Sequence, residues 1–175
     1  MTEEQVPAWV EGRLEPRGKL EVHRLGLRHM AVSVFVTDGP RVLIQRRAAG
    51  KYHSALLWAN TCCTHPRWGE AAEACAHRRL REELGIAGLS PTFAGQVEYR
   101  AEVGGGMIEH EVVEIFVAAA TVDLALAPDP AEVAETRWVP IAVLAQEASA
   151  QPDRFTAWLR IYLAQHRGLI FGPSL

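Results

Sequence analysis

The sequence predicts a single domain of the α/β or α+β class, built on one mixed β-sheet with few helices. Three observations support this prediction. The 175 residues fit one domain, and a domain of ~150 residues buries about two-thirds of the surface of its unfolded chain. Runs of β-branched and apolar residues, which are typical of strands, recur along the chain. Few segments show the apolar spacing of a helix, so strands should outnumber helices.

The first predicted elements are a hairpin and a helix. Met30 to Val36 and Val42 to Arg46 are rich in β-branched and apolar residues, and the Thr-Asp-Gly-Pro segment between them has turn chemistry. A helix is expected from Ala71 to Leu84, with Gly85 as its C-terminal stop. The apolar residues that fall near helical spacing are Ala72, Cys75, Ala76, Leu80 and Leu84.

A second hairpin and a second helix follow. Residues 96–103 and 107–118 are expected to pair as strands, because the three glycines at 104–106 supply the positive φ that a chain reversal needs. Another strand is expected at 136–139, after a loop at 128–135 with room for a helical turn. The terminal helix is predicted from residues spaced i, i+3, i+4, i+7 and i+8, which are Phe155, Trp158, Leu159, Tyr162 and Leu163.

Composition narrows the possible partners and compartment. With 49% hydrophobic residues, 22% charged residues and a net charge of −3, the chain is expected to bind neither nucleic acid nor an anionic membrane. No apolar run approaches the ~20 residues of a membrane span, and the acidic start lacks the features of a signal peptide, so a cytoplasmic location is expected. Cys62, Cys63 and Cys75 make a poor disulfide framework and are expected to be free thiols. No protein partner is implied.

Charged and apolar residues and one glycine stand at a fixed spacing in and beside the first predicted helix. The residues concerned are Glu70, Arg78, Leu80, Glu82, Glu83, Gly85 and Ile86. Their spacing resembles the Nudix box, in which Gly, Glu and an Arg-Glu pair precede an apolar residue, a Glu-Glu pair, Gly and a final apolar residue. Two positions depart from that motif: Thr64 replaces its first Gly, and Arg79 replaces the Glu that should follow Arg78.

Arg79 changes what this helix is expected to do. Residues 79 and 83 share a helical face, and in Nudix hydrolases carboxylates on that face bind the metals that activate water. A guanidinium removes one ligand and offers a bidentate donor to phosphate oxygens. We therefore expect a site that holds a diphosphate but hydrolyses it poorly. The alternative is a solvated helix face with i,i+4 ion pairs among Arg78, Arg79, Arg81, Glu82 and Glu83.

A thiol and an imidazole stand two residues apart. Cys63 and His65 alternate with Thr64, so in an extended segment their side chains point the same way. Most free cysteines are small buried apolar residues, and this remains the preferred interpretation of Cys62 and Cys75. Cys63 is therefore the thiol singled out for chemistry.

Two carboxylates share a strand face with apolar residues in the second hairpin. Glu109 and Glu111 alternate in phase with Val113 and Ile115. Carboxylates on an apolar face are costly unless a metal or a proton pairs with them. The alternative is an edge strand whose acidic face is wet.

Three histidines could join these carboxylates. His23 and His29 precede the first predicted strand of the hairpin, and His65 follows the thiol. Each alone is more often a hydrogen-bonded histidine than a ligand. With Glu109 and Glu111 they would supply three imidazole nitrogens and two carboxylates, a set that suits Mn²⁺, Mg²⁺ or Zn²⁺. His53 also lies nearby in sequence but is left out of this set.

Three segments jointly resemble the type 1 isopentenyl-diphosphate Δ-isomerases. They are Trp58-Ala59-Asn60-Thr61-Cys62-Cys63-Thr64-His65-Pro66, the altered Nudix helix and Ile108-Glu109-His110-Glu111. The resemblance runs from about Lys19 to the terminal helix. It implies a Nudix-type mixed sheet sandwiched by helices, a single domain over 1–175 with a core at about 28–165, and a contribution to the site from 1–27.

The resemblance also implies a reaction and roles for residues. The family interconverts isopentenyl and dimethylallyl diphosphate, a step of isoprenoid biosynthesis, by protonating the alkene and deprotonating the tertiary carbocation. Cys63 matches one acid/base group, and Glu111, assisted by Tyr99, matches the other. Trp158 matches an aromatic residue placed against the cation, with simple core packing as its alternative role.

Two metals and a set of cations are implied as well. Glu83 matches a ligand of the Mg²⁺ that bridges to the substrate diphosphate. A second divalent ion, Mn²⁺ or Mg²⁺ with Zn²⁺ as a further candidate, matches a site formed by His23, His29, His65, Glu109 and Glu111. The phosphate-binding cations of the family match Lys19, Arg47, Lys51 and Arg79.

Two rival functions compete with this interpretation. A Nudix pyrophosphohydrolase is the first, and Arg79 argues against it. The second is a structural zinc or binding module built from Cys62, Cys63, His65 and Cys75. Such a module predicts that the fold itself depends on the metal.

Overall fold

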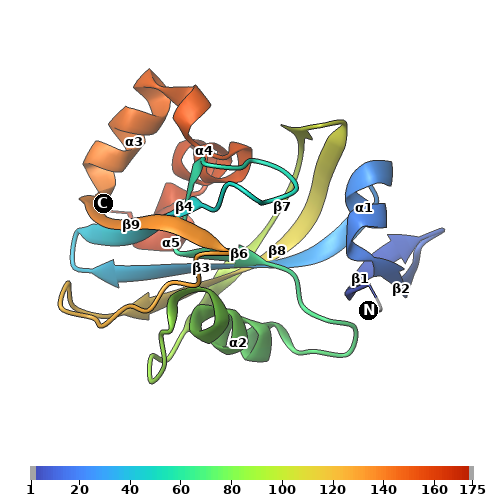
Figure 1. Ribbon diagram of the computed structural model, residues 1–175, viewed down its shortest axis with the longest axis horizontal. Coiled ribbons are helices and arrows are strands. Elements are labelled where there is room, and N and C mark those ends of the chain that lie inside the picture. The colour runs from blue at the N-terminus through green and yellow to red at the C-terminus, as the bar shows by residue number, and fades with distance from the viewer. Residues whose placement is uncertain (1–2, 174–175) are drawn as a thin grey trace.

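A mixed sheet of nine strands forms the centre of the protein, as Figure 1 shows for the computed structural model, which describes residues 3–173. Helix α2 covers one face of the sheet, and α3, α4 and α5 cover the other. The strands are β1 (Gln5–Val10), β2 (Arg13–Gly18), β3 (Arg28–Asp38), β4 (Arg41–Arg47), β5 (Trp58–Ala59), β6 (Cys62–Thr64), β7 (Thr92–Gly104), β8 (Met107–Ala119) and β9 (Val133–Pro140). The helices are α1 (Lys19–Leu25), α2 (Ala72–Leu84), α3 (Ile141–Ala150), α4 (Ala157–Gln165) and α5 (Arg167–Phe171), with a 3₁₀ turn at Pro152–Arg154.

Strand β3 organises the sheet because it pairs with strands from both halves of the chain. It runs parallel to β8 from Arg28 to Thr37. Its other edge pairs antiparallel with β1, β6 and β4 in turn. In this register His29 lies beside Glu111, and Ser33 lies beside Cys63. Residues far apart in sequence therefore meet along one central strand.

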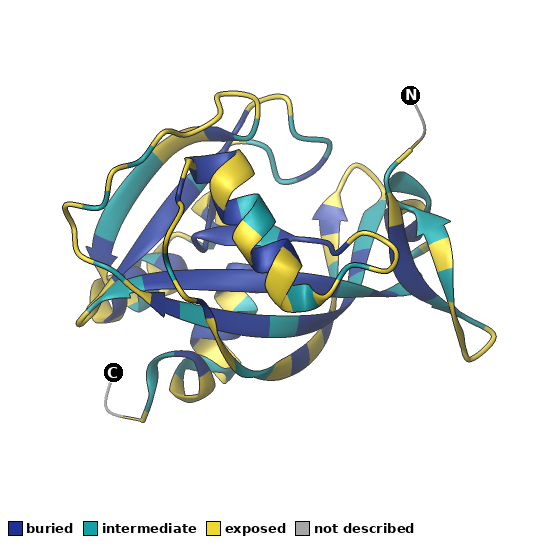
Figure 2. Ribbon diagram, turned by 90° about the horizontal axis from the view of Figure 1, so that it is seen from below, coloured by how far each residue is buried: buried dark blue, intermediate teal, exposed yellow. Residues whose placement is uncertain are grey.

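The alternation of side chains along β3 separates two apolar clusters. Val32, Val34 and Val36 belong to the cluster under α2. Phe35 belongs to the cluster under α4 and α5. Figure 2 shows the consequence for α2, whose buried side faces the sheet and whose exposed side faces outward. Ser33 is a buried hydroxyl on the same strand face as Phe35, which makes this face polar at one point.

The predicted hairpins and the first helix are confirmed. Strands β3 and β4 pair across the predicted turn, and β7 and β8 pair across Gly104–Gly106, whose φ angles of 88°, 62° and 75° only glycine adopts readily. Helix α2 begins one residue after the predicted start and ends as predicted. Gly85 follows it in the left-handed region at φ 67°, and a Cβ there would lie 2.7 Å from that of Ala127.

Other elements differ from the prediction. Strand β9 begins at Val133, so it takes in part of the stretch that was expected to be a loop, and residues 120–132 contain turns but no helix. The terminal helix is present as α4, and α5 follows it. Strands β1 and β2 and helix α1 were not predicted, since β2 is an exposed edge strand with little apolar alternation. Helix α3 was also missed, although Ile141, Leu144 and Ala148 are buried at helical spacing.

The N-terminal hairpin and α1 form a unit at one end of the sheet, at the right in Figure 1. Strand β1 pairs with β2 along its length and touches β3 at Ala8 and His29. Helix α1 ends at Leu25, with Gly26 as its C-cap, and its buried residues are Val22 and His23. This unit brings Lys19 and His23 next to the central strands. No helix between residues 3 and 173 is long and apolar enough to span a membrane.

Candidate active site

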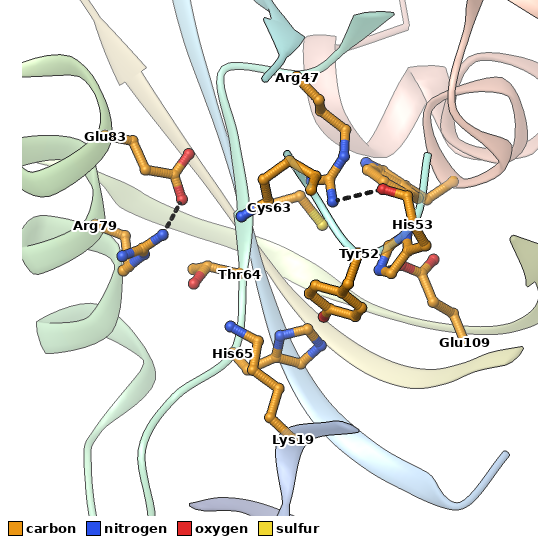
Figure 3. Close-up of a pocket in the computed structure, with 12 residues that line it drawn as sticks. Lys19, Arg47, Tyr52, His53, Cys63, Thr64, His65, Arg79, Glu83 and Glu109 are labelled. Atoms are coloured by element: carbon orange, nitrogen blue, oxygen red, sulfur yellow. Dashed lines mark hydrogen bonds and ion pairs between the residues drawn. The ribbon is translucent and has the colours of Figure 1, made fainter. Parts of the chain in front are cut away.

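A polar pocket opens where β6, the loop after β4, α1 and α2 meet (Figure 3). Its walls combine cations, carboxylates, imidazoles and one thiol in a chain whose other buried positions are mostly apolar. All four of the cations expected to bind phosphate are part of it. The lining residues are Lys19, Arg47, Lys51, Tyr52, His53, Cys63, Thr64, His65, Arg79, Glu83, Glu109 and Trp158.

Strand β6 sends its two thiols to opposite faces of the sheet. Cys63 lines the pocket, whereas Cys62 is buried with Cys75 in the cluster under α2. The structural zinc module is therefore wrong, because Cys62 and Cys75 lie on one face and Cys63 and His65 on the other. Among residues 3–173, the groups that could hold a metal contain only histidine and glutamate.

The half-buried Cys63 thiol lies beside the Ser33 hydroxyl, which in turn contacts the Tyr162 hydroxyl. Ser33 Oγ donates to Cys63 Sγ at 3.4 Å and lies 3.0 Å from the hydroxyl oxygen of Tyr162. Burial raises the pKa of the Cys63 thiol well above its ordinary value, and the charges of Glu111 and Glu109 act in the same direction. At neutral pH the sulfur therefore holds its proton.

Glu111 lies at the centre of a buried hydrogen-bonded cluster. Its Oε1 is 2.9 Å from Nε2 of His65 and 3.5 Å from Nε2 of His29, and its Oε2 accepts from the Tyr99 hydroxyl at 2.8 Å. Burial alone would raise the pKa of Glu111, but the hydrogen bonds from His29 and His65 outweigh it and hold the pKa well below its ordinary range. Glu111 is thus a carboxylate at the pH where Cys63 is a thiol.

Glu109 shares the Tyr99 hydroxyl with Glu111 but has the opposite tendency. Its Oε2 lies 2.8 Å from the same hydroxyl oxygen. Burial and the negative charge of Glu111 raise the pKa of Glu109 well above its ordinary range. Strand β8 lies between β3 and β7, and Glu109 and Glu111 are 2% and 0% exposed. The alternative of a wet edge strand is therefore wrong, and the pair needs a proton or a cation.

The histidines around Glu111 are prepared to bind a metal. Nδ1 of His23 lies 2.6 Å from the Lys19 carbonyl oxygen, and Nδ1 of His29 lies 2.7 Å from that of Leu27. A carbonyl can only accept, so each Nδ1 carries a proton. In the neutral ring Nε2 then presents a lone pair to a metal, whereas donation from His29 Nε2 to Glu111 requires a second proton on that ring. Nε2 of His23 is buried without a hydrogen-bond partner, and burial lowers the pKa of His23 to about 4.

The structure divides the five expected ligands between two adjoining groups. Ligand atoms of His23, His29, His65 and Glu111 lie within 4.8 Å of one another. Glu109 is outside that group and instead joins His23 and His53 in a second one, also within 4.8 Å. A buried histidine that the sequence analysis left out is therefore part of the cluster. The signal for His53 in the sequence was its position two residues after Lys51, one of the residues expected to bind phosphate.

Three of the four cations expected to bind phosphate are already paired with carboxylates. Nζ of Lys19 lies 3.1 Å from Glu4 Oε2. Nζ of Lys51 lies 2.5 Å from Glu132 Oε2, and Arg79 Nη2 lies 3.3 Å from Glu132 Oε1. Glu132 was not found from the sequence, because it lies in a loop without a motif. One carboxylate thus bridges two of the four cations.

Arg79 and Glu83 face the pocket from α2, as the helical spacing predicted. Nη2 of Arg79 donates to Glu83 Oε1 at 2.7 Å, and the Gln45 amide donates to Glu83 Oε2 at 2.8 Å. Their side chains are 15% and 6% exposed, so the alternative of a solvated helix face is wrong for this pair. Arg78 has a different role, because it makes two hydrogen bonds to Glu70 at 2.6 and 2.8 Å and holds the start of the helix.

Trp158 belongs both to the core and to the pocket wall. It is 1% exposed and packs in the cluster under α4, yet its ring also lines the pocket. Its Nε1 donates to Asn60 Oδ1 at 3.1 Å, which fixes the plane of the indole. The guanidinium carbon of Arg47 lies 5.2 Å from the ring centroid, within reach of a cation–π contact.

Comparison with known sequences gives a consistent result over nearly the full chain. The NUDIX domain model matches residues 27–159. The isopentenyl-diphosphate Delta-isomerase of Cereibacter sphaeroides is 70% identical over 169 residues, covering 97% of this chain and 96% of the relative. That of Rhodobacter capsulatus is 61% identical and covers 99% and 98% of the two chains. The one from Ruegeria pomeroyi is 55% identical, with 97% and 94% covered.

Solved structures support the fold. A crystal structure of a Deinococcus radiodurans protein superposes with a TM-score of 0.73 at 14% identity, covering 93% of this chain and 98% of the other. A MutT NUDIX hydrolase from Burkholderia pseudomallei gives 0.60 at 22% identity, covering 79% and 98%. At these identities the likeness concerns the fold alone. The sequence relatives decide the family: the chain is a NUDIX-fold member of the isopentenyl-diphosphate Delta-isomerase family.

Proposed function

We propose that the pocket interconverts isopentenyl and dimethylallyl diphosphate by proton transfer at the carbon–carbon double bond. One observation carries this proposal. Cys63 lines the pocket and Glu111 is buried in the adjoining cluster of histidines and glutamates, and their surroundings favour a neutral thiol and a charged carboxylate at the same pH. The isomerisation needs one group that gives a proton and one that takes a proton, and each group must be able to reverse its role. Cys63 and Glu111 are the two groups, with Tyr99 supporting Glu111 through its hydroxyl.

The cations at the pocket mouth bind the diphosphate. Lys19, Arg47, Lys51 and Arg79 all line the pocket and supply positive charge and hydrogen-bond donors to phosphate oxygens. Arg79 stands where a Nudix hydrolase has a carboxylate, so this helix grips the diphosphate instead of collecting the metals that activate water. The diphosphate therefore serves to hold the substrate while its alkene end reaches Cys63.

Two divalent ions complete the site in this proposal. Glu83, buried on α2, would hold a Mg²⁺ that supplies positive charge to the diphosphate, and the cluster around Glu111 would hold Mn²⁺ or Mg²⁺, with Zn²⁺ as a further candidate. The unpartnered Nε2 of His23 and the raised pKa of Glu109 support a cation there. When bound, this ion supplies positive charge that keeps both carboxylates ionised. Residues 1–27 contribute to this site through Lys19 and His23.

The tertiary carbocation requires protection from water. Cys63 and the Trp158 ring line the same pocket, and Trp158 is 1% exposed. An aromatic face stabilises an adjacent cation without offering a nucleophile, and fixed dipoles in a dry site act more strongly than they would in water. We assign this role to Trp158, in addition to its place in the core.

Isotope incorporation tests the proposal. Purified protein, Mg²⁺ and isopentenyl diphosphate are incubated in D₂O, and the substrate is followed by NMR. We expect dimethylallyl diphosphate that carries solvent deuterium, with no free phosphate. A Nudix pyrophosphohydrolase would instead release phosphate without forming the isomer, and that outcome would overturn the proposal.

A further inference from the structure

His53 lies inside the cluster around the two carboxylates, although nothing in the family comparison assigns it a role. We propose that His53 is a sixth protein ligand of the ion held by His23, His29, His65, Glu109 and Glu111. A sixth ligand closes that ion to water and to substrate. This inference rests on the metal site of the proposed function but not on the reaction itself.

The segment that carries His53 is held in place from both sides. The residue lies between β4 and β5, and its carbonyl oxygen accepts from Arg47 Nη2 at 3.1 Å. Its side chain is 3% exposed. The imidazole stacks on that of His23, with ring centroids 5.4 Å apart and planes inclined by 29°, and meets the edge of Trp158 at 5.9 Å. Figure 3 shows its ring directed toward Glu109.

The two ring nitrogens of His53 have different neighbours. Nδ1 lies 3.2 Å from Ser54 Oγ, a hydroxyl that can accept a hydrogen bond. Nε2 lies 3.4 Å from Glu109 Oε1, which can also only accept when ionised. When Nδ1 carries the proton and donates it to Ser54, the lone pair of Nε2 faces the carboxylate of Glu109. A cation bound between these two groups removes their electrostatic repulsion. Ligands of one first-row ion lie up to about 4.4 Å apart, given bonds of about 2.0–2.2 Å. Ligand atoms of His23, His53 and Glu109 all lie within 4.8 Å of one another, which is close to that limit.

The two ligand groups are two sides of a single site. His23 belongs to both groups. Its Nδ1 faces the Lys19 carbonyl, so only Nε2 is free to bind, and one nitrogen lone pair binds one ion. The six donors do not all lie within 4.8 Å of one another, so in our proposal the two groups close on the one ion that His23 can bind. Mn²⁺ and Mg²⁺ prefer that number, so no position is left for water next to a carbocation that water would capture.

A purely supporting role for His53 makes a different prediction. In that case Nε2 would carry the proton and donate to Glu109, holding this carboxylate in position. Loss of such a supporting group also weakens metal binding by about 10–100-fold, so affinity cannot separate the two roles. The number of waters on the bound ion can, because only a lost ligand leaves an open position.

The test uses the full-length protein loaded with Mn²⁺. Wild-type protein is compared with His53→Ala, His53→Gln and a control, His110→Ala. His110 lies on β8 between the two carboxylates but points to the outer face, where its Nε2 is 3.2 Å from Glu98. Measurements are Mn²⁺ per chain by elemental analysis, the Mn²⁺ dissociation constant, and the water-proton relaxation rate produced by bound Mn²⁺. Circular dichroism confirms that each variant is folded.

We expect one Mn²⁺ per wild-type chain with little enhancement of water relaxation. His53→Ala should bind Mn²⁺ about 10–100-fold more weakly and enhance water relaxation severalfold, while His110→Ala matches the wild type. The amide oxygen of His53→Gln can itself bind Mn²⁺, so this variant should lie nearer to the wild type in both measurements. Weaker binding by His53→Ala without enhanced relaxation would overturn the proposal in favour of a supporting role. Because the ion assigned to Glu83 is bound together with the diphosphate, Mn²⁺ is counted without diphosphate, and two Mn²⁺ per chain would then overturn the single site. None of these outcomes depends on isomerase activity, which the D₂O experiment tests separately.

Discussion

Replacing the two adjacent thiols one at a time should separate chemistry from stability. Cys63→Ala removes the thiol that lines the pocket, whereas Cys62→Ala removes one buried under α2. The residues are neighbours in β6, and both receive the same new side chain. Each variant is therefore the matched control of the other.

The structure sets the expected magnitudes. A positioned acid or base contributes about 10²–10⁴-fold to a rate, and the nearest hydroxyl that could replace Cys63 is Ser33, which is too weak an acid or base to do so. We therefore expect kcat of Cys63→Ala to fall by at least ~10³-fold, or about 4 kcal/mol. Cys62→Ala removes one fully buried atom, which should lower the free energy of unfolding by roughly 1 kcal/mol and leave kcat within about threefold.

Two measurements decide the outcome. Initial rates of dimethylallyl diphosphate formation are followed by NMR, and the free energy of unfolding is obtained from urea titration. If Cys62→Ala abolished turnover and Cys63→Ala retained it, the assignment of the pocket thiol would be wrong by one residue. If neither variant lost activity, proton transfer by a thiol would be refuted.

Three further predictions concern charge and metal. Glu132→Gln removes the carboxylate that bridges Lys51 and Arg79. The dissociation constant of inorganic pyrophosphate, measured by calorimetry, should therefore fall by about three- to tenfold. Weaker binding of pyrophosphate would instead mean that Glu132 positions these two cations. Chelation should abolish turnover but leave the circular dichroism spectrum unchanged, since β-sheet and core do not depend on the ion; loss of the fold would contradict this. Burial holds the pKa of His23 at about 4 instead of 6.5. Between these two pH values the unfolded chain therefore binds more protons than the folded chain does. The metal-free protein should lose on the order of 3 kcal/mol as pH falls through that window, a dependence that His23→Gln should reduce in urea titrations at each pH.

The sequence predicted those parts of the fold whose signals are local. The β7–β8 hairpin, its glycine turn and helix α2 follow from alternation, positive φ and helical spacing, each of which is written in a short segment. Strands β1 and β2 were not predicted, because an exposed edge strand needs little apolar alternation when its backbone pairs with a neighbour. Their place depends on contacts with the remainder of the sheet.

The residues of the candidate site divide in the same way, into those with a local signal in the sequence and those placed by tertiary contacts. Cys63, Arg79 and Glu83 could be picked out because a motif and a helical or strand period relate them to their neighbours. His53 and Glu132 could not, since both lie in loops and reach the site through tertiary contacts. Convergence of His29 with Glu111 depends on the parallel pairing of β3 with β8, which no local pattern specifies.

Position 79 determines how many metals the α2 face needs. Arg79 lies within 2.7 Å of Glu82 and of Glu83 and 3.3 Å from Glu132, so one guanidinium offsets carboxylates from two parts of the chain. A glutamate at this position would instead add a negative charge to that group, and only bound cations could then relieve the repulsion. Those additional cations are what a hydrolase uses to activate water against a diphosphate. With Arg79, the same helix reaches near charge balance without them and keeps Glu83 for one ion. In the proposed reaction the diphosphate is therefore bound without being cut, and the reacting bond lies beside Cys63.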